Sequence, residues 1–162
     1  PDGDTGTNLA MTLSAVLSAL DRAPVPDAGQ LLARIADAAL DGARGNSGTI
    51  LSQFLLGLAD GSAGTPAIDG PALARAAEAG ARYARDAMSQ PREGTLLTVL
   101  RTFADALQAG LVARPDATPR DLVLASRDPV ARALAATTTQ LDALREARVV
   151  DAGAQGFVAL LE

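Results

Sequence analysis

The chain has 162 residues, a net charge of −5 and neither Cys nor His. A single domain of this length buries about 68–70% of the surface that its unfolded chain exposes, so a core needs no disulfide or zinc. The missing Cys and His exclude thiol catalysis, an imidazole base and most transition-metal sites, and the acidic balance, with a pI near 4.7, argues against nucleic-acid binding.

Apolar residues recur at helical spacing along nearly the whole chain, and strand signals are almost absent, so we expect an all-α, up-and-down helical bundle. No apolar run approaches the roughly 20 residues of a membrane span, and we expect a cytoplasmic protein. Asp27 and Asp69 are the expected N-caps of the second and fourth helices. The first four helices are predicted at residues 7–20, 28–40, 47–59 and 70–88, with a loop at 60–69.

The second half of the chain has clear helix starts and weaker interiors. A fifth helix is predicted to begin at Thr95, and Thr118-Pro119 opens the sixth with a hydroxyl cap followed by proline. Pro129 lies inside the sixth helix, where proline costs about 3 kcal/mol, so we expect a kink or a break there. The threonines at 137–139 are a second weak point. Further helical segments are predicted at 141–147 and after Gly153.

Four glycine-bearing loops each lead into a helix N-terminus, at residues 1–8, 42–48, 91–95 and 151–156. Every second junction of an up-and-down array lies at the same end, so these loops should converge if residues 119–147 count as one broken helix. Helix N-termini offer unsatisfied N–H groups and the positive end of the dipole, and glycine lets backbone approach an oxyanion. The shared rim is therefore a candidate phosphate site.

The first loop also offers a candidate metal site at Asp2 and Asp4. Two carboxylates held about 4 Å apart repel by about 4 kcal/mol at an effective dielectric near 20, so they gain by sharing a divalent cation. Magnesium suits one or two carboxylates together with substrate phosphates and waters. Taken alone, Asp2-Gly3-Asp4 is most often a solvated turn.

Several other motifs can be tested on the sequence. Residues 42–48 are also compatible with a plain helix C-cap followed by a Ser47 N-cap. The chain contains no Lys, which excludes a Walker A loop. A calcium loop starting at Asp2 requires Gly and Glu where Thr7 and Leu13 stand. A phosphatase with an Asp2 nucleophile would need a preceding buried strand and a supporting Lys.

Together, four short motifs resemble a known family. Residues 1–8 (PDGDTGTN), 42–48 (GARGNSG), 93–95 (EGT) and 150–153 (VDAG), in this order, resemble the DhaL-type domain. This is the nucleotide-binding domain of dihydroxyacetone kinases, and the version here is most similar to the amino-terminal domain of fatty acid kinase catalytic subunits. The resemblance spans essentially the whole chain.

The resemblance implies an eight-helix antiparallel barrel with ATP and two magnesium ions at its open end. The seven helical units predicted here would leave the family's first helix missing, so we expect one domain over residues 1–162 that continues beyond both ends. Relatives usually place a third metal-site Asp or Asn shortly before the first loop, and we expect less than full activity without it. The chain also departs from the family at Arg148, where relatives often carry Gly, and at Pro129.

The resemblance further implies a role for each matched residue. Asp2 and Asp4 would bind the metal ions and bridge the β- and γ-phosphates. The nucleotide would lie against three further sets of residues: Thr5, Gly6, Thr7, Asn8, Gly45, Asn46, Ser47 and Gly48 at the phosphates, Thr95 and Leu96 at the base, and Asp151, Ala152 and Gly153 at the ribose and adenine side.

The implied activity is an ATP-dependent phosphotransferase that converts the carboxylate of a protein-bound fatty acid into an acyl phosphate. Its partner would be a fatty-acid-binding carrier protein or a substrate-binding subunit, and a homodimer stays open. One alternative is the nucleotide-binding subunit of a dihydroxyacetone (glycerone) kinase. Another, of a different class, is a non-catalytic helical module that binds nucleotide or nothing.

Overall fold

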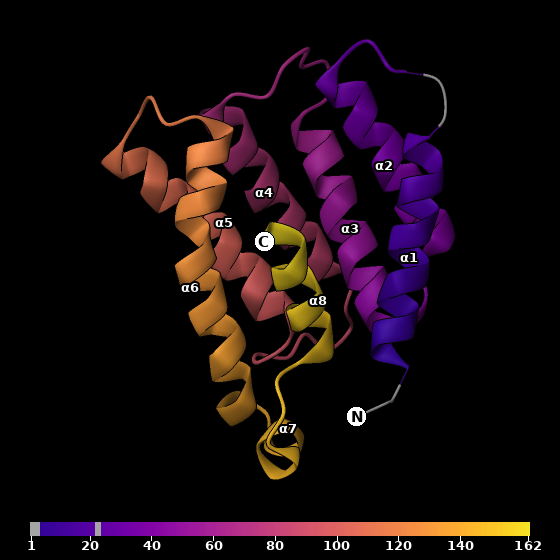
Figure 1. The fold of residues 1–162 in the computed structure, drawn as a ribbon, viewed down its shortest axis with the longest axis vertical. Helices are drawn as coiled ribbons and strands as arrows, with labels where there is room; N and C mark the ends of the chain where they lie inside the picture. The colour runs from indigo at the N-terminus through magenta and orange to yellow at the C-terminus, as the bar shows by residue number, and fades with distance from the viewer. Residues whose placement is uncertain (1–3, 22–23) are drawn as a thin grey trace.

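The computed structural model describes residues 4–21 and 24–162, and these form eight helices and no strand (Figure 1). The all-α prediction is therefore confirmed. The helices are α1 Thr5–Leu20, α2 Ala28–Gly42, α3 Gly45–Gly61, α4 Gly70–Asp86, α5 Leu96–Ala113, α6 Pro119–Gln140, α7 Asp142–Ala147 and α8 Ala152–Leu161. The seven units of the prediction counted residues 119–147 as one broken helix; the break lies at Leu141, whose extended backbone separates α6 from α7 and brings the number of helices among the described residues to eight.

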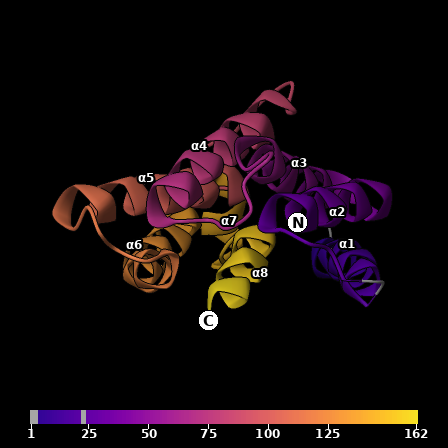
Figure 2. The same ribbon diagram turned by 90° about the horizontal axis from the view of Figure 1, so that it is seen from above.

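Helices α1 to α6 form an antiparallel arc in which each helix packs on its sequence neighbour (Figure 2). Helix α8 lies in the mouth of this arc and contacts α1, α5 and α6. The last helix thereby joins the first to the sixth, so segments from the two ends of the chain lie side by side.

All three phenylalanines of the chain meet in the core and tie α8 to the arc. Phe54 of α3, Phe103 of α5 and Phe157 of α8 make edge-to-face contacts, with ring centroids 5.5 to 6.3 Å apart. Among the described residues, α5 is the one helix with the length and mean hydropathy, 1.3, of a membrane span. It is a core helix here, because Val99, Leu100 and Leu107 are fully buried.

Small residues allow α3 and α4 to pack closely. A Cβ atom on Gly57 would lie 2.5 Å from the Cα of Gly80, and one on Gly80 would lie 2.7 Å from the carbonyl oxygen of Phe54. No side chain fits at such distances, so the two backbones are in direct contact. Alanines supply most of the buried residues of α4, which explains how a chain with 2% aromatic residues reaches a dense core.

The helix starts at the end opposite the glycine-bearing loops are confirmed as predicted. The carboxylate of Asp27 accepts from the Gln30 N–H at 2.7 Å, and that of Asp69 accepts from the Ala72 N–H at 2.7 Å. Thr118 forms a capping box with Asp121 at the start of α6. Capping is a local interaction, so the sequence alone locates these three starts.

Helix α6 corrects the expectation of a break at Pro129, because it is continuous from Pro119 to Gln140. The buried residues Leu122, Ser126 and Val130 follow one another at a spacing of four, and their burial offsets the hydrogen bond that proline removes. The threonine run does not end the helix either. Thr137 and Thr139 donate their hydroxyls to backbone carbonyls three residues earlier, which is compatible with a helix.

The ends of the first four helices differ from the prediction by two residues at the end of the bundle that carries the glycine-bearing loops: α1 begins at Thr5 rather than residue 7, and α2 ends at Gly42 rather than residue 40. Helix α3 begins at Gly45 rather than Ser47 and continues to Gly61, and α4 ends at Asp86 rather than Met88. The residue before a proline avoids the helical region, which disfavours helix at Gln90 and helps to end α4 early. Residues 88–92 are therefore available to line the end of the bundle.

Candidate functional site

The four glycine-bearing loops, the first of them described from residue 4 on, lie at the same end of the bundle, the lower end in Figure 1, as the alternation of helix directions predicts. They surround an open cavity of about 1250 Å³. Its wall contains residues from the N-terminal turns of α1, α3 and α8, from the segment between α4 and α5, and from the α7–α8 connection. Segments 150 residues apart thus meet around one hollow.

Most of the residues singled out from the sequence line this cavity. They are Asp4, Thr5, Gly6, Asn8, Gly45, Asn46, Ser47, Thr95, Asp151 and Ala152. Thr7 is exposed and does not line the cavity, whereas Gly48, Leu96 and Gly153 are buried behind its wall. Asp2 lies outside the described residues, so its predicted role stays a prediction.

Sequence reasoning missed a second set of lining residues. Met88, Ser89, Gln90 and Arg92 enter the wall because α4 ends at Asp86. Pro91 was the sequence feature that could have predicted the early end of α4, because the residue before a proline disfavours helix. An apolar part of the wall comes from Ile50, Leu97, Leu144, Val149 and Val150, with Gln155 beside it. The lining therefore combines polar residues of helix N-termini with apolar residues that suit a flat, uncharged group.

The N-termini of α1 and α3 meet directly. Gly45 has a φ of 61°, and a Cβ there would lie 2.8 Å from the Asn8 Nδ2 atom. The hydroxyl of Thr12, fully buried, lies 3.0 Å from the carbonyl oxygen of Asn8 and 3.3 Å from that of Gly42. The close approach of Gly45 to Asn8 places the first turns of α1 and α3 next to each other, and the Thr12 hydroxyl ties α1 to the C-terminal end of α2.

The two helix N-termini that meet at Asn8 differ from the other long helices in their capping. Neither Asp4, the N-cap of α1, nor Arg44, the N-cap of α3, accepts a hydrogen bond from the first turn with its side chain. The N-caps of α2, α4, α5, α6 and α8 all do. The N-cap of α3 is Arg44, so the Ser47 N-cap considered from the sequence is wrong. The positive dipole ends of α1 and α3 are not capped by the side chain of an N-cap residue, so an anion can bind there.

Asp151 joins three helices at the rim of the cavity. Its carboxylate caps α8 by accepting from the Ala154 N–H at 2.8 Å, and its backbone N–H donates to Thr137 Oγ1 of α6 at 3.0 Å. Burial raises the pKa of the Asp151 carboxyl above its ordinary value, and hydrogen bonds from the backbone N–H groups of Ala154, Leu96 and Gly153 oppose that shift. The carboxylate thus faces the N-termini of both α5 and α8.

The cavity offers a modest set of ligands for a hard cation. No group of three or more acidic residues is placed to hold a metal ion within residues 4–21 and 24–162. Magnesium needs only one or two carboxylates when phosphates and waters complete its shell. The exposed carboxylate of Asp4, which accepts no hydrogen bond from the first turn of α1, fits that requirement.

Comparisons with known proteins agree with the motifs. The family model of the DAK2 domain matches residues 1–162. The chain is 33% identical over 162 residues to Protein YloV of Bacillus subtilis, covering all of this chain and 29% of that protein. It is also 35% identical over 157 residues to an uncharacterized protein of Staphylococcus saprophyticus, covering 97% of this chain and 28% of that protein. The chain thus spans less than a third of the relatives it matches.

Proposed function

Because the chain belongs to the DAK2 domain family, we propose that it is the ATP- and magnesium-binding domain of a kinase. One observation carries the proposal: the N-termini of α1 and α3, which lack side-chain caps, meet at the wall of a cavity large enough for a nucleotide. Helix N-termini bind phosphate through backbone N–H groups and the helix dipole. The carboxylate of Asp4 lines the same cavity.

Different residues of the cavity wall have different proposed roles. Backbone N–H groups of the first turns, at Gly6 of α1 and Gly45–Ser47 of α3, bind the phosphates. Thr5 and Asn8 line the cavity beside them, and Asp4, with Asp2, holds magnesium. The metal ion supplies neutralisation of the charge on the β- and γ-phosphates. The apolar residues Leu97 and Val150 contact the base, and Thr95 lies beside them. Catalysis then depends on positioning and charge stabilisation, as in other phosphoryl transfers.

The acceptor we propose is the carboxylate of a fatty acid bound to a separate carrier protein, which would become an acyl phosphate. The motifs at 1–8, 42–48, 93–95 and 150–153 support this choice through their resemblance to fatty acid kinases. The partner's place is supported by the relatives' length, more than two thirds of which lies outside this chain. Because ATP is abundant in the cytoplasm, a cytoplasmic location is part of the proposal. Dihydroxyacetone is the alternative acceptor, and a non-catalytic nucleotide module is the alternative without turnover.

Calorimetry with ATP tests the nucleotide site. We expect binding that requires magnesium and that the D4N substitution weakens at least about tenfold, because one charged ligand is lost. The matched control is D21N, which removes the same charge at the C-cap of α1, away from the cavity. Absence of heat at millimolar ATP and magnesium would reject nucleotide binding and leave a helical scaffold.

Turnover with two acceptors tests the substrate. ATP consumption is measured with a fatty-acid-loaded carrier protein and, separately, with dihydroxyacetone and its substrate-binding subunit. We expect phosphate on the fatty acid carboxylate. Phosphate on the triose alone would replace the fatty acid proposal by the dihydroxyacetone alternative, while keeping the nucleotide site.

A further inference from the structure

A second hollow lies between α4 and α5, outside the large cavity. Its volume is about 340 Å³, and its wall contains the arginines Arg82, Arg85 and Arg101, one acid, Glu93, and four uncharged residues, Ala81, Leu97, Thr98 and Thr102. Three guanidinium groups face two carboxylates, Glu93 on the wall and Asp105 paired with Arg101, which leaves the hollow a local excess of positive charge on a chain whose net charge is −5. We call it the arginine groove.

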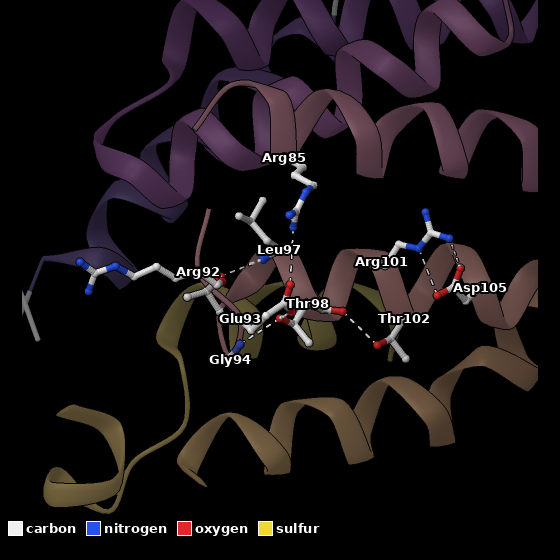
Figure 3. A network of polar contacts seen from close by, with 10 residues as sticks. Arg85, Arg92, Glu93, Gly94, Leu97, Thr98, Arg101, Thr102 and Asp105 are labelled. Carbon is white, nitrogen blue, oxygen red and sulfur yellow. Dashed lines mark hydrogen bonds and ion pairs between the residues drawn. The ribbon is translucent and has the colours of Figure 1, made fainter. Parts of the chain in front are cut away.

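The arginines of the groove have N–H donors that their present ion pairs do not use. Arg85 meets Glu93 through one nitrogen at 3.5 Å, and Arg101 uses two nitrogens on Asp105 at 2.9 and 3.1 Å (Figure 3). A guanidinium has five N–H donors, so both groups have unused ones. The Arg82 guanidinium lies 5.6 Å from the ring centroid of Tyr83, and no ion pair to it occurs among the described residues.

The existing ion pairs are easily exchanged. The side chains of Arg85 and Glu93 are 58% and 71% exposed, and pairs between such exposed groups contribute little to stability. An anion carrying two charges and several acceptor oxygens competes well for them, because arginine binds phosphate through paired, charge-assisted hydrogen bonds. A single carboxylate fills less of the groove and offers fewer acceptors.

The groove and the large cavity share a wall. Leu97 lines both hollows, and Glu93 lines the groove while Arg92 and Thr95 line the cavity. Figure 3 shows Arg92 pointing away from the Arg85–Glu93 pair.

Hydrogen bonds hold the shared segment together. Glu93 accepts from the Thr98 hydroxyl at 2.7 Å, and the Gly94 N–H donates to that same hydroxyl at 2.9 Å. A ligand that draws Arg85 away from Glu93 therefore acts on the segment that also forms the cavity wall.

From this arrangement we propose that the arginine groove is a second anion site, which binds a phosphate-class dianion between α4 and α5. The groove is separate from the proposed nucleotide site and does not depend on it. The phosphate group can be free inorganic phosphate or the phosphomonoester of a larger molecule, since both present the same oxygens to Arg82, Arg85 and Arg101.

Amide NMR resolves the two sites in one experiment. Inorganic phosphate is titrated into the ¹⁵N-labelled chain at constant ionic strength, made up with sodium chloride so that general screening does not change. We expect saturable shifts at Ala81, Thr98 and Thr102. A parallel titration with AMP shows whether the groove also accepts a phosphomonoester, and equal shifts with both sources fit the proposal.

Variants assign the effect to the guanidinium groups. The double substitution R85Q/R101Q should raise the dissociation constant for phosphate at least about tenfold, and R85K/R101K should weaken binding less, because lysine keeps the charge without paired donors. R75Q removes an exposed arginine of α4 that does not line the groove, and should leave binding unchanged. All three variants change exposed side chains, and dispersed spectra verify their folds.

Two results would overturn the proposal. One is a set of shifts confined to Asn46, Ser47 and Ala152 of the large cavity, which would mean that phosphate binds only at the proposed nucleotide site. The other is equal loss of binding in R75Q and R85Q/R101Q, which would mean a diffuse charge effect. Failure of magnesium-ATP to shift the cavity residues would instead reject the proposed function and leave the groove untouched.

Discussion

Thr137 of α6 holds Asp151, the N-cap of α8, in place through a hydrogen bond, and the substitution of Thr137 by valine tests that hydrogen bond. The side chain is fully buried, its hydroxyl donates to the Leu134 carbonyl at 2.7 Å, and it accepts from the Asp151 N–H at 3.0 Å. Valine has the same branched shape, so T137V removes these two hydrogen bonds without leaving a large cavity.

The expected cost follows from the group left without a partner. The Leu134 carbonyl keeps its place in the helix ladder, whereas the Asp151 N–H loses the hydroxyl that accepts from it. A fully buried donor left unsatisfied costs about 1–3 kcal/mol, and the lower end, about 1 kcal/mol, applies here because the Asp151 N–H is partly buried. For a domain of this size each kcal/mol lowers Tm by about 2–4 °C, so T137V should lower Tm by about that amount.

The assay is urea and thermal unfolding followed by circular dichroism, with two comparison variants. T139V removes a hydroxyl with the same contact to a carbonyl three residues earlier, but on an exposed residue, and should change stability by less than about 0.5 kcal/mol. T137S restores the hydroxyl and should recover most of the loss. Equal stability of T137V and T139V would refute the role assigned to the Thr137–Asp151 hydrogen bond.

Three further predictions concern single residues. D151N keeps an oxygen to cap α8 and removes a carboxyl whose pKa is raised. The stability that this carboxyl contributes to the wild type is present below a pH of about 4 and is lost as the pH rises through the raised pKa. In urea unfolding, the stability of D151N relative to the wild type should therefore increase between pH 4 and 7, and a difference that does not change with pH would contradict this. P129A should stabilise the chain by about 1–3 kcal/mol, because it restores a backbone donor inside continuous α6, and an unchanged Tm would contradict it. R148G should add about 0.5–1 kcal/mol, because Arg148 has a left-handed φ of 56°, whereas R148A, measured in the same melts, should add nothing.

Local sequence patterns were sufficient for much of the fold. Asp27, Asp69 and Thr118 were predicted as N-caps because a cap joins residues two or three positions apart, and no distant contact is needed. The alternation of helix directions likewise predicted which loops share an end. The break expected at Pro129 failed because local propensity was outweighed by burial of the α6 face, which the sequence does not quantify.

The site followed the same division. The sequence by itself determined an all-helical chain with glycine-bearing loops before particular helices, and the motif resemblance determined the family. Only the tertiary structure decided that residues 88–92 line the cavity, that the N-termini of α1 and α3 lack side-chain caps, and that the Asp151 carboxylate faces two helix N-termini. Each of these features depends on the exact residue at which a helix begins or ends, or on a contact between residues that are far apart in the chain.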